Sequence, residues 1–154
     1  MYPFLRLSGV VATSLLRPGL SFADESVIPF RVLPSDLDNN LHMNNGRYLM
    51  MMDLARWDML LRARLVGAML RRRWMPVVSR IEMRFRRSLG PFQRYELRSR
   101  VDRWDAKWFF IQQRFERGGV LHAEGEVQGL LRSPQGNVPP EALMALDAKR
   151  RRVR

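Results

Sequence analysis

A polar stretch of the chain, Asp36 to Tyr48, gathers the residue types that could hydrolyse a bond at a carbonyl. It contains the carboxylates of Asp36 and Asp38 and the imidazole of His42. Such a reaction needs a carboxylate that attacks the carbonyl or activates water, and N–H donors for the developing oxyanion. A helix predicted to begin near Asn45 would offer free N–H groups and the positive end of its dipole at this point.

The same residues have structural explanations, which the sequence leaves open. Asp36 and Asp38 could organise a loop or cap a helix, the commonest role of Asp at such a place. His42 could hydrogen-bond a backbone carbonyl, and Asn44 is typical of a helix N-cap. Tyr48 could simply pack on the first helical turn.

The elements around this stretch predict an α+β domain. Phe30 to Leu33 is strand-like and ends at Pro34. A helix is predicted from about residue 45 to 68, since apolar residues recur there at spacings of three and four. Its predicted apolar face consists of Leu49, Met52, Ala55, Met59 and Ala63.

Four antiparallel strands are predicted after the helix. In Val77 to Phe85 the pattern places Val77, Ile81, Met83 and Phe85 on one face, and Arg80, Glu82, Arg84 and Arg86 on the other. Tyr95 to Val101 alternates in the same way, and Trp108 to Phe115 follows. Gly118-Gly119 predicts a hairpin turn into Val120 to Leu131. A short helix is expected from Glu141 to Lys149.

The stretch resembles the D-x-D-x-x-x-H-x-N-N-x-x-Y signature of the 4-hydroxybenzoyl-CoA thioesterase-like family of the hot-dog superfamily. The resemblance implies a hot-dog fold, in which an antiparallel sheet wraps around one long helix. It implies an acyl-CoA thioesterase that releases free acid and CoA, without a cofactor. Asp38 then matches the catalytic carboxylate, as nucleophile or general base, and Asn40 and His42 match its polar companions. Asn45 matches the position whose main-chain N–H binds the oxyanion.

Further site residues are expected outside the core of the signature. Tyr48 closes the signature and is a substrate-binding candidate. Arg84 and Arg86 are the arginines we expect to hold the CoA phosphates, because Arg suits bidentate phosphate binding; the alternative is a solvated face or an intersubunit ion-pair lattice. Asp53 and Arg56 match an acid/Arg pair of relatives, and more often form an ion pair. The methionines of the helix could line an acyl tunnel or be ordinary core: Met50, Met51, Met52 and Met59.

Composition bounds the remaining possibilities. The 154 residues predict one domain, divided into an N-terminal segment (1–26), the hot-dog domain (27–133), and a C-terminal short helix with a basic tail (134–154). The net charge of +12 predicts attraction to polyanions, yet no nucleic-acid-binding motif occurs. With no cysteine and two distant histidines, no metal site is expected. No stretch reaches the length of a membrane span.

The expected protein is therefore a cytoplasmic homo-oligomer, a dimer or tetramer. One helix covers only one face of a sheet, and in relatives of this family the active site combines residues of two subunits. Its partner is an acyl-CoA substrate or an acylated carrier protein. The alternative function is a hot-dog protein that binds acyl-CoA or an acyl carrier protein without turning it over, since a fold alone does not fix an activity.

Overall fold

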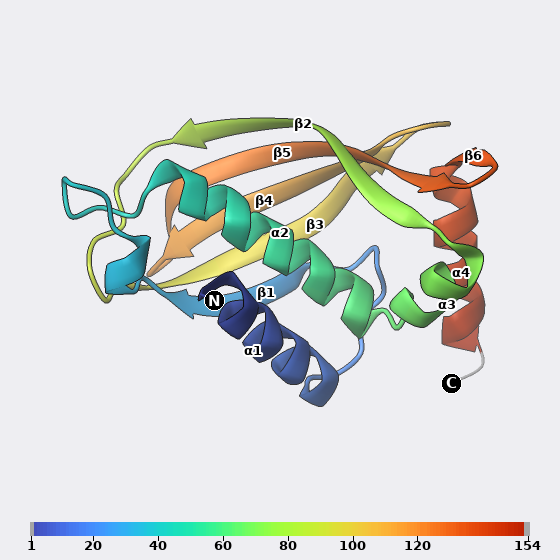
Figure 1. Ribbon diagram of the computed structural model, residues 1–154, viewed down its shortest axis with the longest axis horizontal. Coiled ribbons are helices and arrows are strands. Elements are labelled where there is room, and N and C mark those ends of the chain that lie inside the picture. The colour runs from blue at the N-terminus through green and yellow to red at the C-terminus, as the bar shows by residue number, and fades with distance from the viewer. Residues whose placement is uncertain (1, 153–154) are drawn as a thin grey trace.

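The structure is a computed structural model that describes residues 2–152, in which one antiparallel sheet curves around a long helix (Figure 1). The sheet contains β1 (Ser26–Arg31), β2 (Met75–Phe85), β3 (Arg94–Trp104), β4 (Phe109–Arg117), β5 (Val120–Ser133) and β6 (Gly136–Val138). Its order is β1-β3-β4-β5-β2, with β6 paired to β5, so β1 and β2 lie at the two edges of that path. The predicted arrangement of sheet and helix is confirmed.

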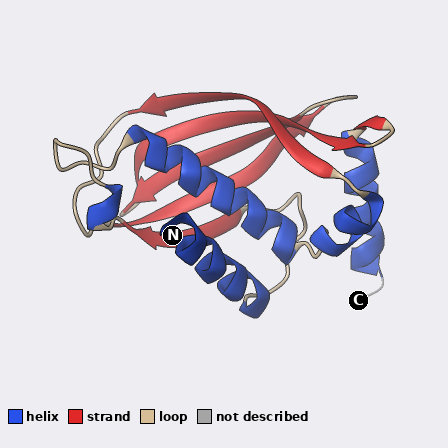
Figure 2. Cartoon of the chain, viewed as in Figure 1, coloured by secondary structure: helices blue, strands red, loops and turns tan. Residues whose placement is uncertain are grey.

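Four α-helices accompany the sheet within the described residues: α1 (Tyr2–Leu16), α2 (Asn45–Arg62), α3 (Val66–Arg72) and α4 (Pro140–Arg152). Figure 2 shows α2 crossing one face of the sheet, with α1 beside it and α3 and α4 at the far end. A short 3-10 turn, Pro34–Asp36, precedes the polar stretch. No helix among the described residues is long and apolar enough to cross a membrane.

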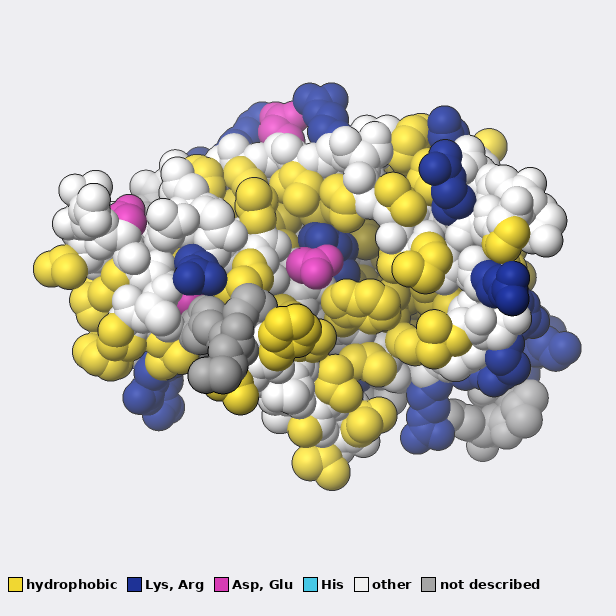
Figure 3. Space-filling model, in the orientation of Figure 1, with side chains coloured by type: hydrophobic (Ala, Val, Ile, Leu, Met, Phe, Trp, Pro, Cys, Tyr) yellow, Lys and Arg dark blue, Asp and Glu magenta, His cyan; other side chains and the backbone are white. Residues whose placement is uncertain are grey.

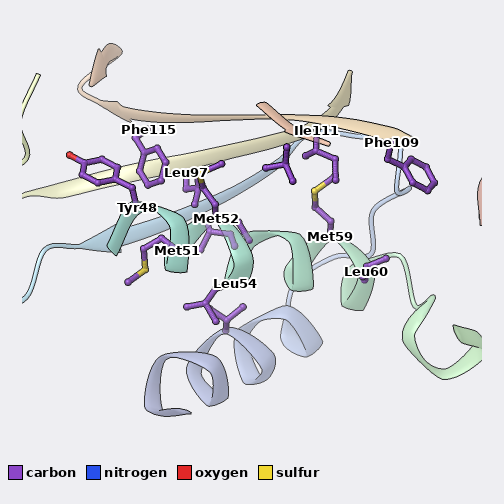
Figure 4. Close-up of a cluster of buried hydrophobic side chains, with 14 of the residues drawn as sticks. Tyr48, Met51, Met52, Leu54, Met59, Leu60, Leu97, Phe109, Ile111 and Phe115 are labelled. Atoms are coloured by element: carbon purple, nitrogen blue, oxygen red, sulfur yellow. The ribbon is translucent and has the colours of Figure 1, made fainter. Parts of the chain in front are cut away.

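The core lies between α2 and the sheet. Tyr48, Met52 and Met59 point from α2 toward buried side chains of β3 and β4, among them Phe115 (Figure 4). Burying side chains of this size stabilises the fold by about 1.5–3 kcal/mol each. Met51, Met52 and Met59 are essentially inaccessible, so these three are ordinary core residues, as one of the two interpretations expected.

The opposite side of α2 is covered by α1. Met51 and Leu54 point toward that helix in Figure 4. One turn of α2 after Leu54, the buried carboxylate of Asp58 accepts hydrogen bonds from Ser14 of α1 (2.6 Å) and Ser26 of β1 (2.5 Å). It also forms ion pairs with Arg17 (3.6 Å) and Arg62 (3.7 Å). Asp58 therefore holds α1, α2 and β1 together.

Several predicted boundaries are wrong for identifiable reasons. The first strand begins earlier, at Ser26, and the long helix ends at Arg62 rather than near residue 68. The helical conformation is interrupted at Arg64, whose φ of 57° is left-handed. It resumes in the next helix, α3. Leu49 is exposed, although the other four residues of the predicted apolar face are buried.

The predicted alternation is confirmed in β3 as far as Val101 and in β4 as far as Phe115, where the register shifts, and it is interrupted within β2. The pairing of β2 with β5 shifts register between Val78 and Arg80, which places an extra residue, Ser79, in β2. An extra residue moves every side chain on one side of it to the other face. Val77 consequently lies on the face opposite Ile81. Arg71 to Arg73 form the last turn and the left-handed C-cap of α3.

The hairpin between β4 and β5 is as predicted. Gly118 and Gly119 have φ values of 57° and 76°, the left-handed conformation that a two-residue turn of this type requires. The predicted C-terminal helix is present and longer, as α4, and β6 was not predicted.

Charged residues occupy the face of the sheet turned away from α2. Arg98 contacts Glu25, Glu96 and Glu116 at 2.7–3.1 Å, and Arg103 contacts Glu126 at 3.1 Å. A face with cations and carboxylates interleaved in this way is stable in water, so covering it with a second subunit is not needed to bury apolar surface.

Candidate active site

The polar stretch forms a closed loop that leads into α2. Asp36 is completely buried, and its carboxylate accepts a hydrogen bond from the Leu33 N–H (2.8 Å) and pairs with Arg6 of α1 (2.5 Å). Its carbonyl accepts from the Asn44 N–H (2.8 Å). Asp36 thus fixes both ends of the loop. The sequence left open whether its role is chemical or structural, and these contacts favour the structural role.

Asp38 organises the tip of the loop. Its Oδ1 accepts hydrogen bonds from the backbone N–H groups of Asn40 (2.8 Å) and His42 (3.2 Å), and its own N–H donates to the His42 carbonyl (2.8 Å). Leu41 completes this turn with a φ of 57°. Within the described part of the chain no donor bonds to Oδ2. One oxygen of Asp38 is therefore anchored while the other is available to a ligand.

The beginning of α2 supplies N–H donors at the same place. Asn44 is the N-cap, as predicted: its Oδ1 accepts from the Gly46 N–H (2.9 Å), and its carbonyl accepts from the Arg47 N–H (2.8 Å). The hydrogen bonds among the described residues leave the N–H of Asn45 without a protein acceptor. The first N–H of a helix is an orphan donor next to the positive dipole end, which suits it to an oxyanion.

A shallow hollow of about 270 Å³ brings these groups together. Two segments form its wall: the loop with the first turn of α2, and the chain that leaves β2. The lining residues are Asp38, His42, Met43, Asn45, Tyr48, Phe85, Arg86, Arg87 and Ser88. Asn40 does not line this hollow; its contribution to the loop is the backbone N–H that donates to Asp38.

Tyr48 forms the apolar base of the hollow. Its ring packs edge-on against Phe85 (5.1 Å between centroids) and Phe115 (4.8 Å). Burial raises the pKa of its phenol, and a backbone hydrogen bond with Leu89 opposes the rise. Its hydroxyl is therefore protonated at neutral pH. These ring contacts support the packing role of Tyr48. Only the side of Tyr48 that lines the hollow could also contact a substrate.

The two arginines singled out from the sequence are separated by the structure. Arg86 lines the hollow and pairs with Glu124 (2.6 Å). Arg84 lies on the charged outer face, where it pairs weakly with Glu82 (3.8 Å). Of the two arginines expected to bind phosphate, Arg86 alone lines the hollow that contains Asp38.

Sequence reasoning missed the rest of this wall. Arg87 and Ser88 line the hollow, and neither belongs to a recognisable motif. The backbone carbonyl of His122 accepts from the N–H groups of Arg86 (2.9 Å) and Arg87 (3.0 Å), and its Nδ1 lies 3.1 Å from the Ser88 carbonyl. His122 therefore holds this wall in place through its backbone carbonyl and its ring. The basic pair that follows β2 was the only available signal.

The acid/Arg pair on α2 lies in a different place. Arg56 pairs with Asp53 (3.0 Å) and donates to Gln113 (2.9 Å), a fully buried residue that in turn donates to the Met52 carbonyl (3.0 Å). Burial lowers the pKa of Arg56, and the nearby Asp53 charge opposes this. Both side chains reach an apolar cavity of about 290 Å³ between the second half of α2 and the sheet, walled by Trp57, Leu60, Val127 and others.

Metal chemistry has no visible donor set in the described part of the chain, because no three His, Asp or Glu residues gather with suitable geometry there. The groups that the hollow brings together are a carboxylate with one available oxygen, a backbone N–H at a helix start and two arginines.

Comparisons with known proteins agree with this geometry. Residues 32–146 match the family described as the thioesterase-like superfamily. The chain is 37% identical to Protein THEM6 of Xenopus laevis over 118 residues, which is 75% of this chain and 55% of that protein. It therefore spans little more than half the length of this curated relative.

Solved structures share the fold. The structure of YbaW, a probable thioesterase of Escherichia coli, superposes with a TM-score of 0.73 at 21% identity, covering 79% of this chain and 95% of YbaW. The hypothetical protein SAV2348 of Staphylococcus aureus, solved in complex with CoA, gives a TM-score of 0.71 at 11% identity, covering 83% of this chain and 84% of that one. With a hot-dog architecture and a family match across three quarters of its length, the chain belongs to the thioesterase-like superfamily.

Proposed function

We propose that this chain is an acyl-CoA thioesterase that hydrolyses the thioester to free acid and CoA, with Asp38 as the catalytic carboxylate. The observation that carries the proposal is the pairing, in one hollow, of an available Asp38 oxygen with the uncommitted N–H of Asn45. A thioester carbonyl held between them would meet its base or nucleophile on one side and its oxyanion donor on the other.

Each remaining group has a role in this proposal. The Asn45 N–H, at the positive end of α2, stabilises the negative charge that develops on the carbonyl oxygen. His42 and Asn40 act on the loop that carries Asp38, since both donate backbone N–H groups to its Oδ1. Tyr48 closes the base of the hollow.

Arg86 and Arg87 are the groups proposed to hold the CoA phosphates. Both line the hollow that contains Asp38, and guanidinium groups bind phosphate through paired hydrogen bonds. The same fold is seen with CoA in SAV2348, which favours CoA over a carrier protein as the leaving group. Arg84, directed to the outer face, is not part of this proposal.

We also propose a homodimer that forms through β2. This strand is one of the two edges of the sheet, and none of its eleven residues is buried. Its exposed apolar side chains include Met75, Val77, Val78 and Phe85. A long edge strand with exposed apolar residues favours pairing with a second chain, and a two-fold axis would extend the sheet antiparallel. Sedimentation should show at least a dimer, and a fully active monomer would contradict this. The proposed compartment is the cytoplasm, and a cysteine-free composition fits such a reducing compartment.

Hydrolysis of a panel of aromatic, short-chain and long-chain acyl-CoA thioesters tests the activity. The chain contains no cysteine, so a thiol reagent reports only the CoA released. Turnover of at least one class that depends on Asp38 is the expected result. Tight binding of acyl-CoA without thiol release, measured by calorimetry on the same sample, would instead establish the non-catalytic alternative.

A further inference from the structure

The outer face of α1 carries no charged side chain within the described residues. Arg6 is the only charged residue of the helix, and it is turned inward onto Asp36. Phe4, Leu15 and Leu16 are 73%, 69% and 87% exposed. A surface helix normally presents charged and polar residues to water, so an uncharged outer face with exposed leucines indicates contact with an apolar phase.

The serine and threonine hydroxyls of α1 have hydrogen-bond partners within the protein. Ser8 donates to the Leu5 carbonyl (2.9 Å), and Thr13 donates to the Gly9 carbonyl (2.9 Å). Both side chains are exposed, yet each hydrogen-bonds to the preceding turn of its own helix. This internal bonding lowers the cost of removing a hydroxyl from water, because the donor keeps a partner. Ser8 and Thr13 can therefore enter an apolar environment without leaving their hydroxyl donors unpaired.

A basic cleft adjoins the C-terminal end of α1. Its volume is about 400 Å³, and it lies between α3 and α4. Among its described lining residues, Asp147 is the only one with a carboxylate. That carboxylate is buried and accepts hydrogen bonds from Ser21 (2.6 Å) and the Phe22 N–H (3.1 Å). The cations are Arg64, Arg71, Arg72, Lys149, Arg150 and Arg151. The cleft is therefore strongly positive.

The apolar and basic surfaces lie on the same side of the protein. Leu20, four residues beyond the end of α1, lines the basic cleft, and its N–H donates to the Arg62 carbonyl at the end of α2 (3.2 Å). Figure 3 shows hydrophobic side chains gathered over α1 along the lower edge of the molecule, with Lys and Arg over α3 and α4 at its lower right. One side of the protein thus joins an uncharged helix face to a positive cluster.

We propose that this side of the protein is a docking surface for an anionic phospholipid bilayer. α1 lies in the plane of the interface with Leu15 and Leu16 among the upper acyl carbons, and the cations of the cleft contact the phosphates of the headgroups. Apolar exposure combined with positive charge is the pattern of interfacial helices. A nucleic acid would bind the cations but would leave the exposed leucines in water. A bilayer therefore fits the surface better, because it accommodates both. This proposal is independent of the thioesterase activity.

Flotation of the full chain with vesicles tests the proposal. Binding is expected to vesicles of phosphatidylcholine mixed with phosphatidylglycerol, to weaken with added salt, and to be far weaker with phosphatidylcholine alone. Arg71→Gln with Lys149→Gln should weaken binding about 30-fold, since each surface cation is worth about fivefold. Neither side chain forms a hydrogen bond or ion pair with another described residue, so the fold should persist. Leu15→Gln with Leu16→Gln should weaken binding at least about tenfold through lost apolar burial.

Matched controls separate this surface from charge in general. Arg80→Gln with Arg100→Gln removes the same charge from the outer face of the sheet, and Val120→Gln removes an exposed apolar residue at the hairpin; both should bind as the parent chain does. Equal loss of binding in the Arg71/Lys149 variant and in the Arg80/Arg100 variant would overturn the proposal in favour of nonspecific charge attraction. So would leucine variants that bind normally, or cleft-dependent binding to a DNA duplex without binding to vesicles.

Discussion

Asp38 has two tasks in the structure, and two substitutions distinguish them. Its Oδ1 holds the loop through the Asn40 and His42 N–H groups, while Oδ2 is available for chemistry. Asp38→Asn keeps a carbonyl oxygen that can accept both backbone hydrogen bonds, yet it removes the negative charge and the basicity. Asp38→Ala removes the acceptor as well.

The expected magnitudes follow from these contacts. Losing two backbone hydrogen bonds costs about 2 kcal/mol of loop stability in Asp38→Ala and little in Asp38→Asn. Losing the base lowers kcat by about 10²–10⁴-fold in either variant, equivalent to about 3–5 kcal/mol of transition-state stabilisation. Asp38→Asn should therefore be as inactive as Asp38→Ala while melting close to the parent chain.

The assay is thiol release from the best acyl-CoA substrate, with thermal melting and acyl-CoA affinity measured on the same samples. Asn44→Ala is the companion variant, because it removes the helix cap at a cost of about 1 kcal/mol without touching the carboxylate. Near-parental kcat in Asp38→Asn, combined with loss in Asp38→Ala, would refute the reasoning. Asp38 would then be a loop residue, and the catalytic group would have to be sought elsewhere.

Three further predictions test the electrostatics of the fold and site. Asp58→Ala leaves Arg62 buried without its carboxylate and should lower the free energy of unfolding by about 3–5 kcal/mol in chemical denaturation. Replacing the exposed Asp53 with Ala should lower it by under about 1 kcal/mol, and equal effects would contradict the assigned network. Arg86→Gln should raise KM for an acyl-CoA and make it less salt-sensitive with kcat nearly intact, while Arg84→Gln changes neither constant; the reverse order would transfer phosphate binding to the outer face. Backbone N–H groups in the β3–β4 turn lower the pKa of Asp105. Its contribution to stability is therefore present above its unfolded pKa of about 3.9 and is lost as the pH falls through the lower folded pKa. An NMR titration that gives Asp105 an ordinary or raised pKa would disprove this prediction.

The parts of this fold that were predictable are those set by local patterns. Tyr95, Leu97 and Ser99 are buried on alternate positions of β3, because a strand with one covered face requires period-two alternation. The Gly118-Gly119 turn was predictable since few other residues adopt two successive left-handed conformations. The loop signature was predictable as a set of residue types, and the structure places Asp38, His42 and Asn45 around one hollow.

The parts that escaped prediction depend on contacts between distant segments. Nothing in Arg62-Ala63-Arg64-Leu65 stops a helix by propensity, and the break follows from burying Leu65 completely while Arg64 turns left-handed. The extra residue at Ser79 leaves no mark in the hydrophobic pattern. The wall formed by Arg87 depends on its hydrogen bond to His122, which lies thirty-five residues further along the chain.

The N-terminal helix shows how such contacts connect regions that the sequence treats as separate. Its Arg6 neutralises the buried Asp36 carboxylate two residues before Asp38, and its Ser14 satisfies the buried Asp58. A buried carboxylate without its partner carries a penalty of several kcal/mol, so the loop that presents Asp38 depends on α1 being in place. The division at residue 26 stays a prediction, and these two contacts favour placing α1 inside the folded unit. A bilayer that binds the outer face of α1 would then act on the side of the helix opposite Asp36, leaving the contacts of the loop intact while the hollow takes up its ligand.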